Sequence, residues 1–267
     1  MIAEIKNNKF QADLPEMLCD DIISSKIDGS LCNKNFVSLV VGSAGTGKTS
    51  IVTALVTSKK KGCKAYRQQF EDVILNIPRS SLKSIKGDPY KTIEDENIHE
   101  ALDEEFLDYV LEKAEENSSQ NYRTLVIIDD ASSKLKQNKA IIDKLTSLVH
   151  KHRHLALSMF ILVQDLVSVP LGIRKNISQL FYFKPSNEKS NQIFREEFMG
   201  LFSKDETNSI LKFVFQKKGD FLNIKIQAEP IEYYRNFNKL IIGNTNNAPQ
   251  KEKEKECGSR NRAPNGA

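Results

Sequence analysis

One stretch of the sequence has the residue types and the spacing of a phosphate-binding loop. It matches the pattern G-x-x-x-x-G-K-[ST] at every fixed position. The loop and the residue after it are Gly42, Ser43, Ala44, Gly45, Thr46, Gly47, Lys48, Thr49 and Ser50. Glycines let backbone N–H groups approach phosphate oxygens closely, and the first turn of a following helix adds further N–H donors. We therefore expect a site for a nucleoside triphosphate here.

The side chains of the loop predict how such a ligand is held. Lys48 would place a cation at the β and γ phosphates, and the hydroxyl of Thr49, or less suitably Ser50, would bind Mg²⁺. The apolar run 36–41 precedes the loop and the helix-compatible stretch 49–58 follows it, as this motif requires. The alternative, an ordinary glycine-rich turn that begins a helix, does not account for that complete context.

A second group of chemically capable residues follows the apolar run 124–128. Asp129 and Asp130 come where this strand would end, as in a Walker B motif. Ligands of open α/β sheets bind at the carboxyl ends of the strands, so Asp129 is expected beside the phosphate loop, holding Mg²⁺ directly or through water. Asp130 is then placed to polarise the attacking water. The alternative is a strand that merely ends in a polar turn.

Two further side chains are candidates for catalysis. The apolar strand 158–163 delivers Gln164 to the same edge of the sheet, where an amide can sense the γ phosphate or orient water; a fully satisfied buried amide is the alternative. Arg174 precedes the strand 180–183, and we expect it to reach the γ phosphate held by an adjacent subunit. The alternative is that Arg174 pairs with a carboxylate or a DNA phosphate. Arg153 is the rival candidate for the arginine that reaches the γ phosphate of the adjacent subunit.

The order of the elements predicts an α/β fold with a central, mostly parallel sheet flanked by helices. Besides the segments above, we expect a strand over 72–78, helices over 102–114 and 136–150, and a hairpin that pairs 213–215 with 221–226. We also expect three parts. They are an N-terminal arm over 1–30 that contributes one strand or short helix, an ATPase domain over 31–243, and a disordered tail over 244–267.

Composition limits the class of protein. The 267 residues are 39% hydrophobic and 28% charged, with a formal charge of +4, which suits a chain with a sizeable core. No apolar run approaches the roughly 20 residues of a membrane span, and the first residues lack the apolar core of a signal peptide, so a cytosol-like compartment is expected. Four cysteines without C-x-x-C spacing are expected to be free thiols.

The charges are distributed unevenly along the chain. Residues 94–116 contain eleven acids and one base, whereas 59–91 contain nine Lys or Arg against three acids and 134–154 contain six against one. The basic segments could contact nucleic-acid phosphates, although a surface of mixed patches explains the charge equally well. His150, His152 and His154 could suggest a metal site, but a basic helix end accounts for them better.

Beyond the phosphate loop, four short stretches resemble the FtsK/HerA superfamily of DNA-pumping P-loop ATPases. They are residues 126–130, 153–155, 162–165 and 173–176, and they look most like the genome-packaging ATPases of large DNA viruses and of virophages. The resemblance spans about residues 36–226. Many relatives have Asp-Glu at the end of the Walker B strand, where this chain has Asp-Asp.

This resemblance implies a P-loop NTPase of the RecA-like (ASCE) type that uses ATP and Mg²⁺. It implies subunits that form a homo-oligomeric ring around double-stranded DNA, hydrolyse ATP between neighbours and drive a viral genome into a capsid, with capsid proteins as partners. The place of action would be the host cytoplasm or a viral factory, and the virion is a further location.

Other functions remain open at this point. They are another DNA-pumping ATPase of the same superfamily, a nucleotide kinase and a nucleotide-binding scaffold without turnover. A small GTPase is disfavoured because Asn138-Lys139-Ala140-Ile141 lacks the carboxylate of the guanine-reading motif Asn-Lys-x-Asp.

Overall fold

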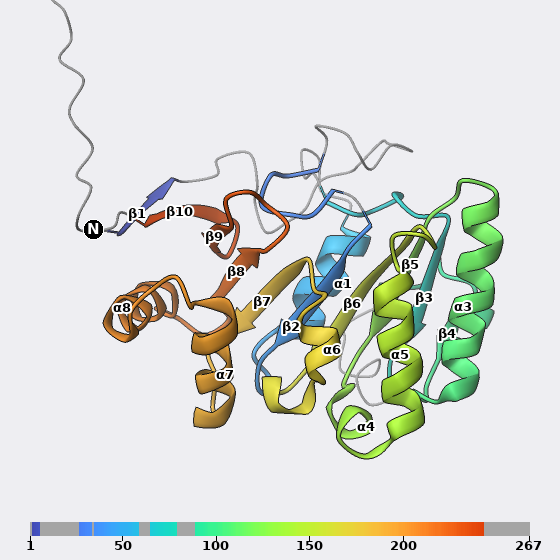
Figure 1. Cartoon of the computed structure of the whole chain (residues 1–267). Coiled ribbons are helices and arrows are strands. Elements are labelled where there is room, and N and C mark those ends of the chain that lie inside the picture. Colours follow the sequence, from blue (N-terminus) through green and yellow to red (C-terminus); the bar gives the residue numbers. More distant parts are fainter. Residues whose placement is uncertain (1, 6–26, 34, 59–64, 79–88, 243–267) are drawn as a thin grey trace, which may run out of the picture.

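The computed structural model describes residues 2–5, 27–33, 35–58, 65–78 and 89–242 (Figure 1). The tail predicted over 244–267 and most of the arm predicted over 1–30 lie outside the described residues, as do Cys19, Cys63 and Cys257. Cys32 is a buried free thiol, as expected for this position.

A single ten-stranded sheet runs through the molecule in the order β1-β10-β9-β8-β7-β2-β6-β5-β3-β4 (Figure 1). The half from β7 to β4 is parallel, and the half from β7 to β1 is antiparallel. The strands are β1 Ile2–Ile5, β2 Val37–Val41, β3 Asp72–Asn76, β4 Ile98–His99, β5 Thr124–Ile128, β6 Leu157–Val163, β7 Gln179–Phe183, β8 Phe221–Lys225, β9 Glu232–Arg235 and β10 Asn238–Ile242. The predicted α/β fold with a central, mostly parallel sheet flanked by helices is confirmed.

The helices lie on both faces of this sheet (Figure 1). They are α1 Lys48–Thr57, α3 Glu104–Ser119, α4 Ser132–Gln137, α5 Lys139–Lys151, α6 Leu171–Arg174, α7 Glu188–Phe198 and α8 Lys204–Val214. Helix α1 packs on one face, and helices α3 to α8 cover the other. No helix in the described part of the chain has both the length and the apolar character that a bilayer span requires.

Alternation of side chains along the buried strands divides the core into two layers. In β6, Met159 and Ile161 face the layer under α3 to α8, whereas Phe160 and Leu162 face the layer under α1. Both faces of the strand are therefore apolar, which is why its sequence is an unbroken apolar run without polar alternation. The same holds for β5, so the polar residues after these strands mark the points where the chain leaves the core.

The segment that enters the first parallel strand is tied to the sheet. The amide of Cys32 donates to Gln179 Oε1 (3.2 Å), and the carbonyl oxygen of Ser30 accepts from Gln179 Nε2 (2.8 Å) and Asn223 Nδ2 (2.9 Å). Ile27 is buried in the layer under α1. The last residues of the predicted arm therefore pack as part of the domain, and β1 pairs with β10.

The predicted hairpin at 213–226 is wrong in its first strand. Phe213 and Val214 end helix α8, which begins at a capping box formed by Ser203 and Glu206. Ile210, Leu211 and Val214 are buried at helical spacing, and this contact with the core outweighs the strand preference of the aromatic run. The second strand is β8, but its partners are β7 and β9.

The predicted helix over 136–150 is two helices that meet at Asn138. Asn138 has an extended backbone (φ −116°, ψ 105°), and its side-chain oxygen accepts from the amide of Ile141 (3.2 Å). An asparagine in this position caps a new helix and interrupts the preceding one. The shorter helix α4 follows directly on the Asp129-Asp130 pair.

Candidate active site

The phosphate loop connects β2 to α1, as its sequence requires. Gly45 (φ 71°) and Gly47 (φ 103°) adopt the left-handed conformation that favours glycine. A Cβ on Gly42 would lie 2.7 Å from Cβ of Phe183 and 2.8 Å from Oγ1 of Thr46, so no larger residue fits without rearrangement. The loop is thus shaped by both backbone conformation and close packing on β7.

Lys48 is folded into the loop that it follows. Its Nζ donates to the carbonyl oxygens of Gly42 (2.6 Å) and Ser43 (3.2 Å), and the residue is only 9% exposed. Burial lowers the pKa of the ammonium, while the charges of Asp129 and Asp130 act in the opposite direction. The cation is therefore held at the loop with two carboxylates near enough to influence its charge.

Thr49 and Asp129 meet across 80 residues of sequence: Thr49 Oγ1 donates to Asp129 Oδ2 at 2.9 Å. Asp129 is buried at the end of β5, and its Oδ1 accepts from the amide of Asp130 (2.9 Å). Burial raises the pKa of the Asp129 carboxyl, although these two hydrogen bonds and Lys48 oppose the shift. A hydroxyl and a carboxylate, both hard oxygen donors, thus lie together beside the phosphate loop.

Asp130 and Gln164 form the outer part of the site. Asp130 is exposed and has a positive φ (54°), an uncommon conformation that asparagine and aspartate tolerate better than other non-glycine residues. Its Oδ1 accepts from Gln164 Nε2 (3.0 Å). Gln164 is exposed, so the alternative of a buried amide is wrong. The amide of Gln164 donates to Ser132 Oγ (2.7 Å), which links the ends of β5 and β6.

The side chain of Arg174 does not join the other predicted site residues, because it is bound to Glu197 on α7. Its Nε and NH2 donate to the two carboxylate oxygens of Glu197 on α7 (2.8 and 2.7 Å). Its NH1 donates to the carbonyl oxygens of Leu166 (3.3 Å) and Val169. Within this chain the guanidinium therefore joins α6, α7 and the segment after Gln164. Arg153 is exposed between α5 and β6, next to where β6 begins.

Two residues near the loop were missed by the sequence interpretation. Ser186 accepts a hydrogen bond from Ser43 (Oγ to Oγ 2.8 Å), and Phe183 packs beneath Gly42. Both lie at or just after the carboxyl end of β7. The rule that selected Asp129 and Gln164 applies equally to this strand end, and it would have identified them.

The three histidines near the end of α5 lie in different surroundings. His152 is buried, with Nδ1 2.7 Å from the carbonyl oxygen of Val149, while His150 and His154 are exposed. Among the described residues, no group of three or more His, Cys, Asp or Glu side chains is arranged to hold a metal ion. Burial lowers the pKa of His152, so it suits a neutral structural role at the helix end.

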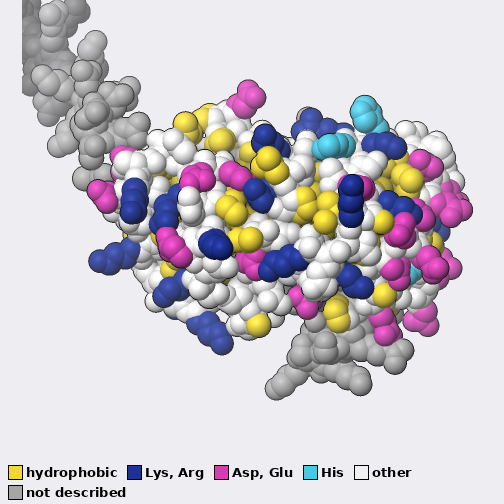
Figure 2. All heavy atoms as spheres, turned by 60° about the horizontal axis from the view of Figure 1, so that its bottom comes forward, with side chains coloured by type: hydrophobic (Ala, Val, Ile, Leu, Met, Phe, Trp, Pro, Cys, Tyr) yellow, Lys and Arg dark blue, Asp and Glu magenta, His cyan; other side chains and the backbone are white. Residues whose placement is uncertain are grey.

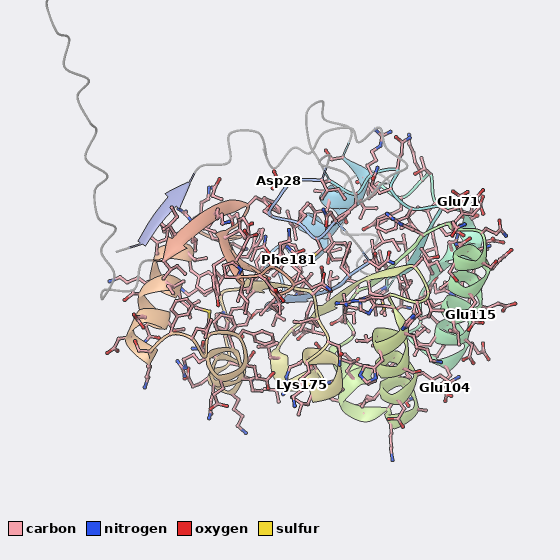
Figure 3. All side chains as sticks on the ribbon, turned by 45° about the horizontal axis from the view of Figure 1, so that its top comes forward. Asp28, Glu71, Glu104, Glu115, Lys175 and Phe181 are labelled. Carbon is pink, nitrogen blue, oxygen red and sulfur yellow. The ribbon has the colours of Figure 1, made fainter. Side chains whose placement is uncertain are left out.

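The charges separate along the molecule. Figure 2 shows acidic side chains gathered at the end of the face that carries α3, and Figure 3 shows Glu104 and Glu115 on that helix. Lys144 of α5 contacts Glu104 (3.3 Å) and Asp108 (2.7 Å), so part of the predicted basic segment is neutralised locally. The exposed basic side chains of 134–154 that remain for a partner include Lys134, Lys139, Lys151 and Arg153.

Comparison with known proteins places the chain in a family. Residues 26–220 match the family model described as Poxvirus A32 protein, and a search of curated proteins found no match. The match covers more than half of the chain, including the phosphate loop and every predicted site residue.

Solved structures with a similar fold include viral packaging enzymes. The genome packaging NTPase B204 from Sulfolobus turreted icosahedral virus 2, in complex with ATP-gammaS, has a TM-score of 0.54 at 12% identity, over 75% of this chain and 97% of that chain. The DNA-packaging ATPase B204 from Sulfolobus Turreted Icosahedral Virus also gives 0.54 at 12% identity, over 76% and 98%.

EssC (ATPases 2 and 3) from Geobacillus thermodenitrificans gives a TM-score of 0.50 at 14% identity, over 71% of this chain and 37% of that chain. At these identities the similarity concerns the fold, which is that of P-loop ATPases. Together with the family match, it confirms the resemblance drawn from the sequence: the chain belongs to the poxvirus A32 protein family.

Proposed function

We propose that this protein is an ATP-hydrolysing translocase that moves double-stranded DNA and packages a viral genome into a capsid. The observation that carries the proposal is the hydrogen bond between Thr49 and Asp129 beside Lys48, with the Asp130–Gln164 pair at the same edge. A phosphate grip, a metal-binding oxygen pair and a pair that can orient water are the parts needed to hydrolyse a nucleoside triphosphate. Membership of the A32 family and the fold shared with B204 support the coupling to DNA.

Thr49 and Asp129 fit Mg²⁺ by their chemistry. Mg²⁺ prefers oxygen ligands and is commonly held by one or two protein oxygens plus phosphates and water. Thr49 Oγ1 and Asp129 Oδ2 supply such oxygens and already lie within hydrogen-bonding distance of each other (2.9 Å). The ion would offset phosphate charge in the transition state. Lys48 would exchange its bonds to the loop carbonyls for bonds to the β and γ phosphates.

The remaining pair would act on water. Gln164 holds Asp130 through one carboxylate oxygen, which leaves the other oxygen to accept a hydrogen bond from the attacking water. As the water oxygen bonds to the γ phosphorus and the bond to the β-phosphate oxygen breaks, the water proton passes towards Asp130. ADP and inorganic phosphate are the products. Loss of the γ phosphate removes the group that joins the loop to the strand ends, which can switch a subunit contact.

We propose that exposed basic side chains on and around α4 and α5 contact double-stranded DNA. They are Lys134, Lys139, Lys151 and Arg153. We propose that a homo-oligomeric ring surrounds the DNA and that capsid proteins receive the ring, in the host cytoplasm, a viral factory or the virion.

Long double-stranded DNA should stimulate phosphate release from ATP, because translocation couples the two. Stimulation should be independent of DNA sequence and should weaken steeply between low and physiological salt, since each phosphate contact releases about one counterion. Phosphate release would be measured with and without DNA over a salt series. A matched test replaces Lys134, Lys139 and Lys151 with Gln, which should lower the salt slope and leave the DNA-free rate unchanged.

ATP turnover that ignores DNA would argue against a translocase. Turnover that instead requires a nucleoside or nucleotide acceptor would identify a kinase, and ATP binding without turnover would identify a scaffold.

We further propose that an arginine reaches the γ phosphate held by the neighbouring subunit, with Arg174 as the first candidate and Arg153 as its rival. Arginine stays charged and can donate to two phosphate oxygens at once. Arg174 would have to exchange Glu197 and the carbonyl oxygens of Leu166 and Val169 for phosphate. Such an exchange would break the bond between α6 and α7 in one subunit when the neighbouring subunit holds ATP.

Mixing two inactive variants tests the assignment. Arg174→Ala and Lys48→Ala subunits should each be inactive alone and should regain part of the activity together, because a junction can then combine an intact loop with an intact arginine. Phosphate release would be measured in rings shown by two different tags to contain both variants. If Arg153→Ala is inactive alone and regains activity with Lys48→Ala, while Arg174→Ala does not, the role moves to Arg153.

Glu197 separates a catalytic Arg174 from a structural one. If Arg174 acts only by tying α6 to α7, Glu197→Gln should also lower activity, by less than Arg174→Ala, which removes the bonds to Leu166 and Val169 as well. If it acts in trans, Glu197→Gln should preserve activity, since the guanidinium is then freer to leave. Absence of recovery in co-assembled rings, with activity lowered in both variants, would refute the trans role.

A further inference from the structure

Next to the phosphate loop lies a hollow that none of the steps above uses. It has a volume of about 360 Å³ and is bordered by Thr46 and Gly47 on one side and by the turn 217–220 on the other. A neighbouring hollow of about 460 Å³ shares Thr46, Phe183 and the same turn. The open space is therefore continuous with the phosphate loop, and its size is typical of a small-molecule site.

Aromatic rings form one wall of this hollow. Phe183 and Phe221 are directly paired in register on β7 and β8, with ring centroids 5.1 Å apart, and Phe237 packs against Phe221 at 5.5 Å. Phe181, labelled in Figure 3, continues the aromatic layer inward at 5.6 Å from Phe221. A Cβ on Gly47 would lie 3.9 Å from the Phe183 ring, so the aromatic wall reaches the phosphate loop.

Helix α1 supplies the other apolar wall through Ile51 and Ala54, both partly exposed. These residues lie one and two turns after the loop lysine, on the helix whose first turn faces the phosphates. A molecule anchored by its phosphates on the loop therefore has an apolar slot beside the same helix, between aliphatic and aromatic side chains.

The carboxylate and the amide side chain in the hollow are already committed to its wall. Asp220 is buried and accepts from the amide of Lys217 (3.0 Å), from Arg235 NH2 (3.3 Å) and from Asn236 Nδ2 (3.2 Å). Asn236 Oδ1 accepts from the amide of Phe221 (3.0 Å). Burial opposes ionisation of Asp220, but these bonds outweigh it and lower its pKa. Both side chains thus fix the turn. The buried Asp220 carboxylate is fully engaged there, whereas Asn236 keeps one N–H donor.

Positive charge lies at the rim. Lys217 and Lys218 are exposed in the turn that borders both hollows. They face a region that a polyphosphate would make strongly negative, so the rim attracts the same ligand that the loop binds.

We propose that this hollow receives the base of the bound nucleotide and holds it by apolar contact between helix α1 and the largely buried aromatic wall. The inference rests on the proposed function, because it presupposes a nucleoside triphosphate on the phosphate loop. Apolar contact with the faces of a base tolerates any base, since every base has a π face. With Asp220 committed to the wall and Asn236 held by two hydrogen bonds, the hollow distinguishes adenine from guanine weakly.

Binding of three probes tests the proposal by calorimetry with Mg²⁺: a non-hydrolysable ATP analogue, its GTP counterpart and inorganic tripolyphosphate, which lacks a base. Ala54→Phe places a ring in the slot and should weaken binding of the ATP analogue by about tenfold or more, the loss expected when the apolar contacts of one base are removed. Tripolyphosphate should bind this variant as it binds the parental protein. Ala101→Phe is the control, because Ala101 is exposed in the loop before α3.

The parental protein gives a second test that no substitution can disturb. The ATP and GTP analogues should bind within a few-fold of each other, and both should bind much more tightly than tripolyphosphate. A strong preference for one purine would overturn the apolar mode of recognition. Unchanged binding of the ATP analogue to folded Ala54→Phe would place the base elsewhere. Failure of all three probes to bind the parental protein would instead overturn the proposed function itself.

Discussion

Lys48→Ala should reduce ATP turnover by roughly a hundredfold to a thousandfold, the cost of removing one preorganised positive group from a developing charge. The ammonium is already held within the loop, between carbonyl oxygens and two carboxylates, so little else can replace it at the phosphates. Phosphate release under saturating ATP and Mg²⁺ measures the effect. The unfolding temperature should change little, because burial of the ammonium is itself unfavourable.

Lys212→Ala is the matched control, since Lys212 is exposed on α8 and the same atoms are removed there. Lys48→Met adds a second variant that keeps most of the aliphatic chain without the charge. Turnover by folded Lys48→Ala at the parental rate would show that the phosphate site has been misassigned.

Asp130→Asn should bind ATP and Mg²⁺ normally and turn over roughly a hundredfold to ten-thousandfold more slowly, the range expected for loss of a general base. This substitution keeps both the backbone conformation and the hydrogen bond of the side chain. Asparagine also tolerates the positive φ of this position, and its Oδ1 can still accept from Gln164 Nε2. Only the negative charge and the basicity are lost. Single-turnover phosphate release, compared with equilibrium binding of ATP, separates the two effects.

Asp205→Asn on the exposed first turn of α8 controls for a charge change elsewhere. Asp130→Glu tests the departure from the Asp-Glu pattern, because glutamate is one methylene longer and accommodates a positive φ less readily. Equal losses of binding and turnover in Asp130→Asn would exclude a role confined to the attacking water.

The nucleotide half of the site could be predicted because its determinants are local or follow from one rule. The loop pattern and its flanking apolar run identify the phosphate grip. Buried parallel strands then carry whatever follows them to a common edge, which brings Asp129 to Thr49 and Gln164 to Asp130. Site residues at strand ends can therefore be predicted from the sequence even when they are far apart along the chain.

Other features depend on packing that no local pattern encodes. Arg174 meets Glu197 because α7 packs against residues 166–168, just before α6, and the sequence contains many other acids as plausible partners. The turn at 217–220 was predicted, but its wrong first strand concealed the way Asp220 joins the turn to β9 through Arg235. Strand preference of an aromatic run and its burial on a helix cannot be separated without knowing what it packs against.

The outermost strands of the sheet determine how the protein behaves at high concentration. Edge strands present unpaired backbone groups that invite association with other chains, and here both edges are short: β4 has two residues and β1 has four. β1 covers β10, whose sequence is apolar at its end and whose Ile241 is half exposed. Removing residues 2–5, or displacing them with a bulky fusion, would expose the edge of β10, which is longer and more prone to associate with other chains. Recombinant protein altered at that end would be prone to aggregate through β10, so a tag placed there would compromise solubility before it affected the nucleotide site.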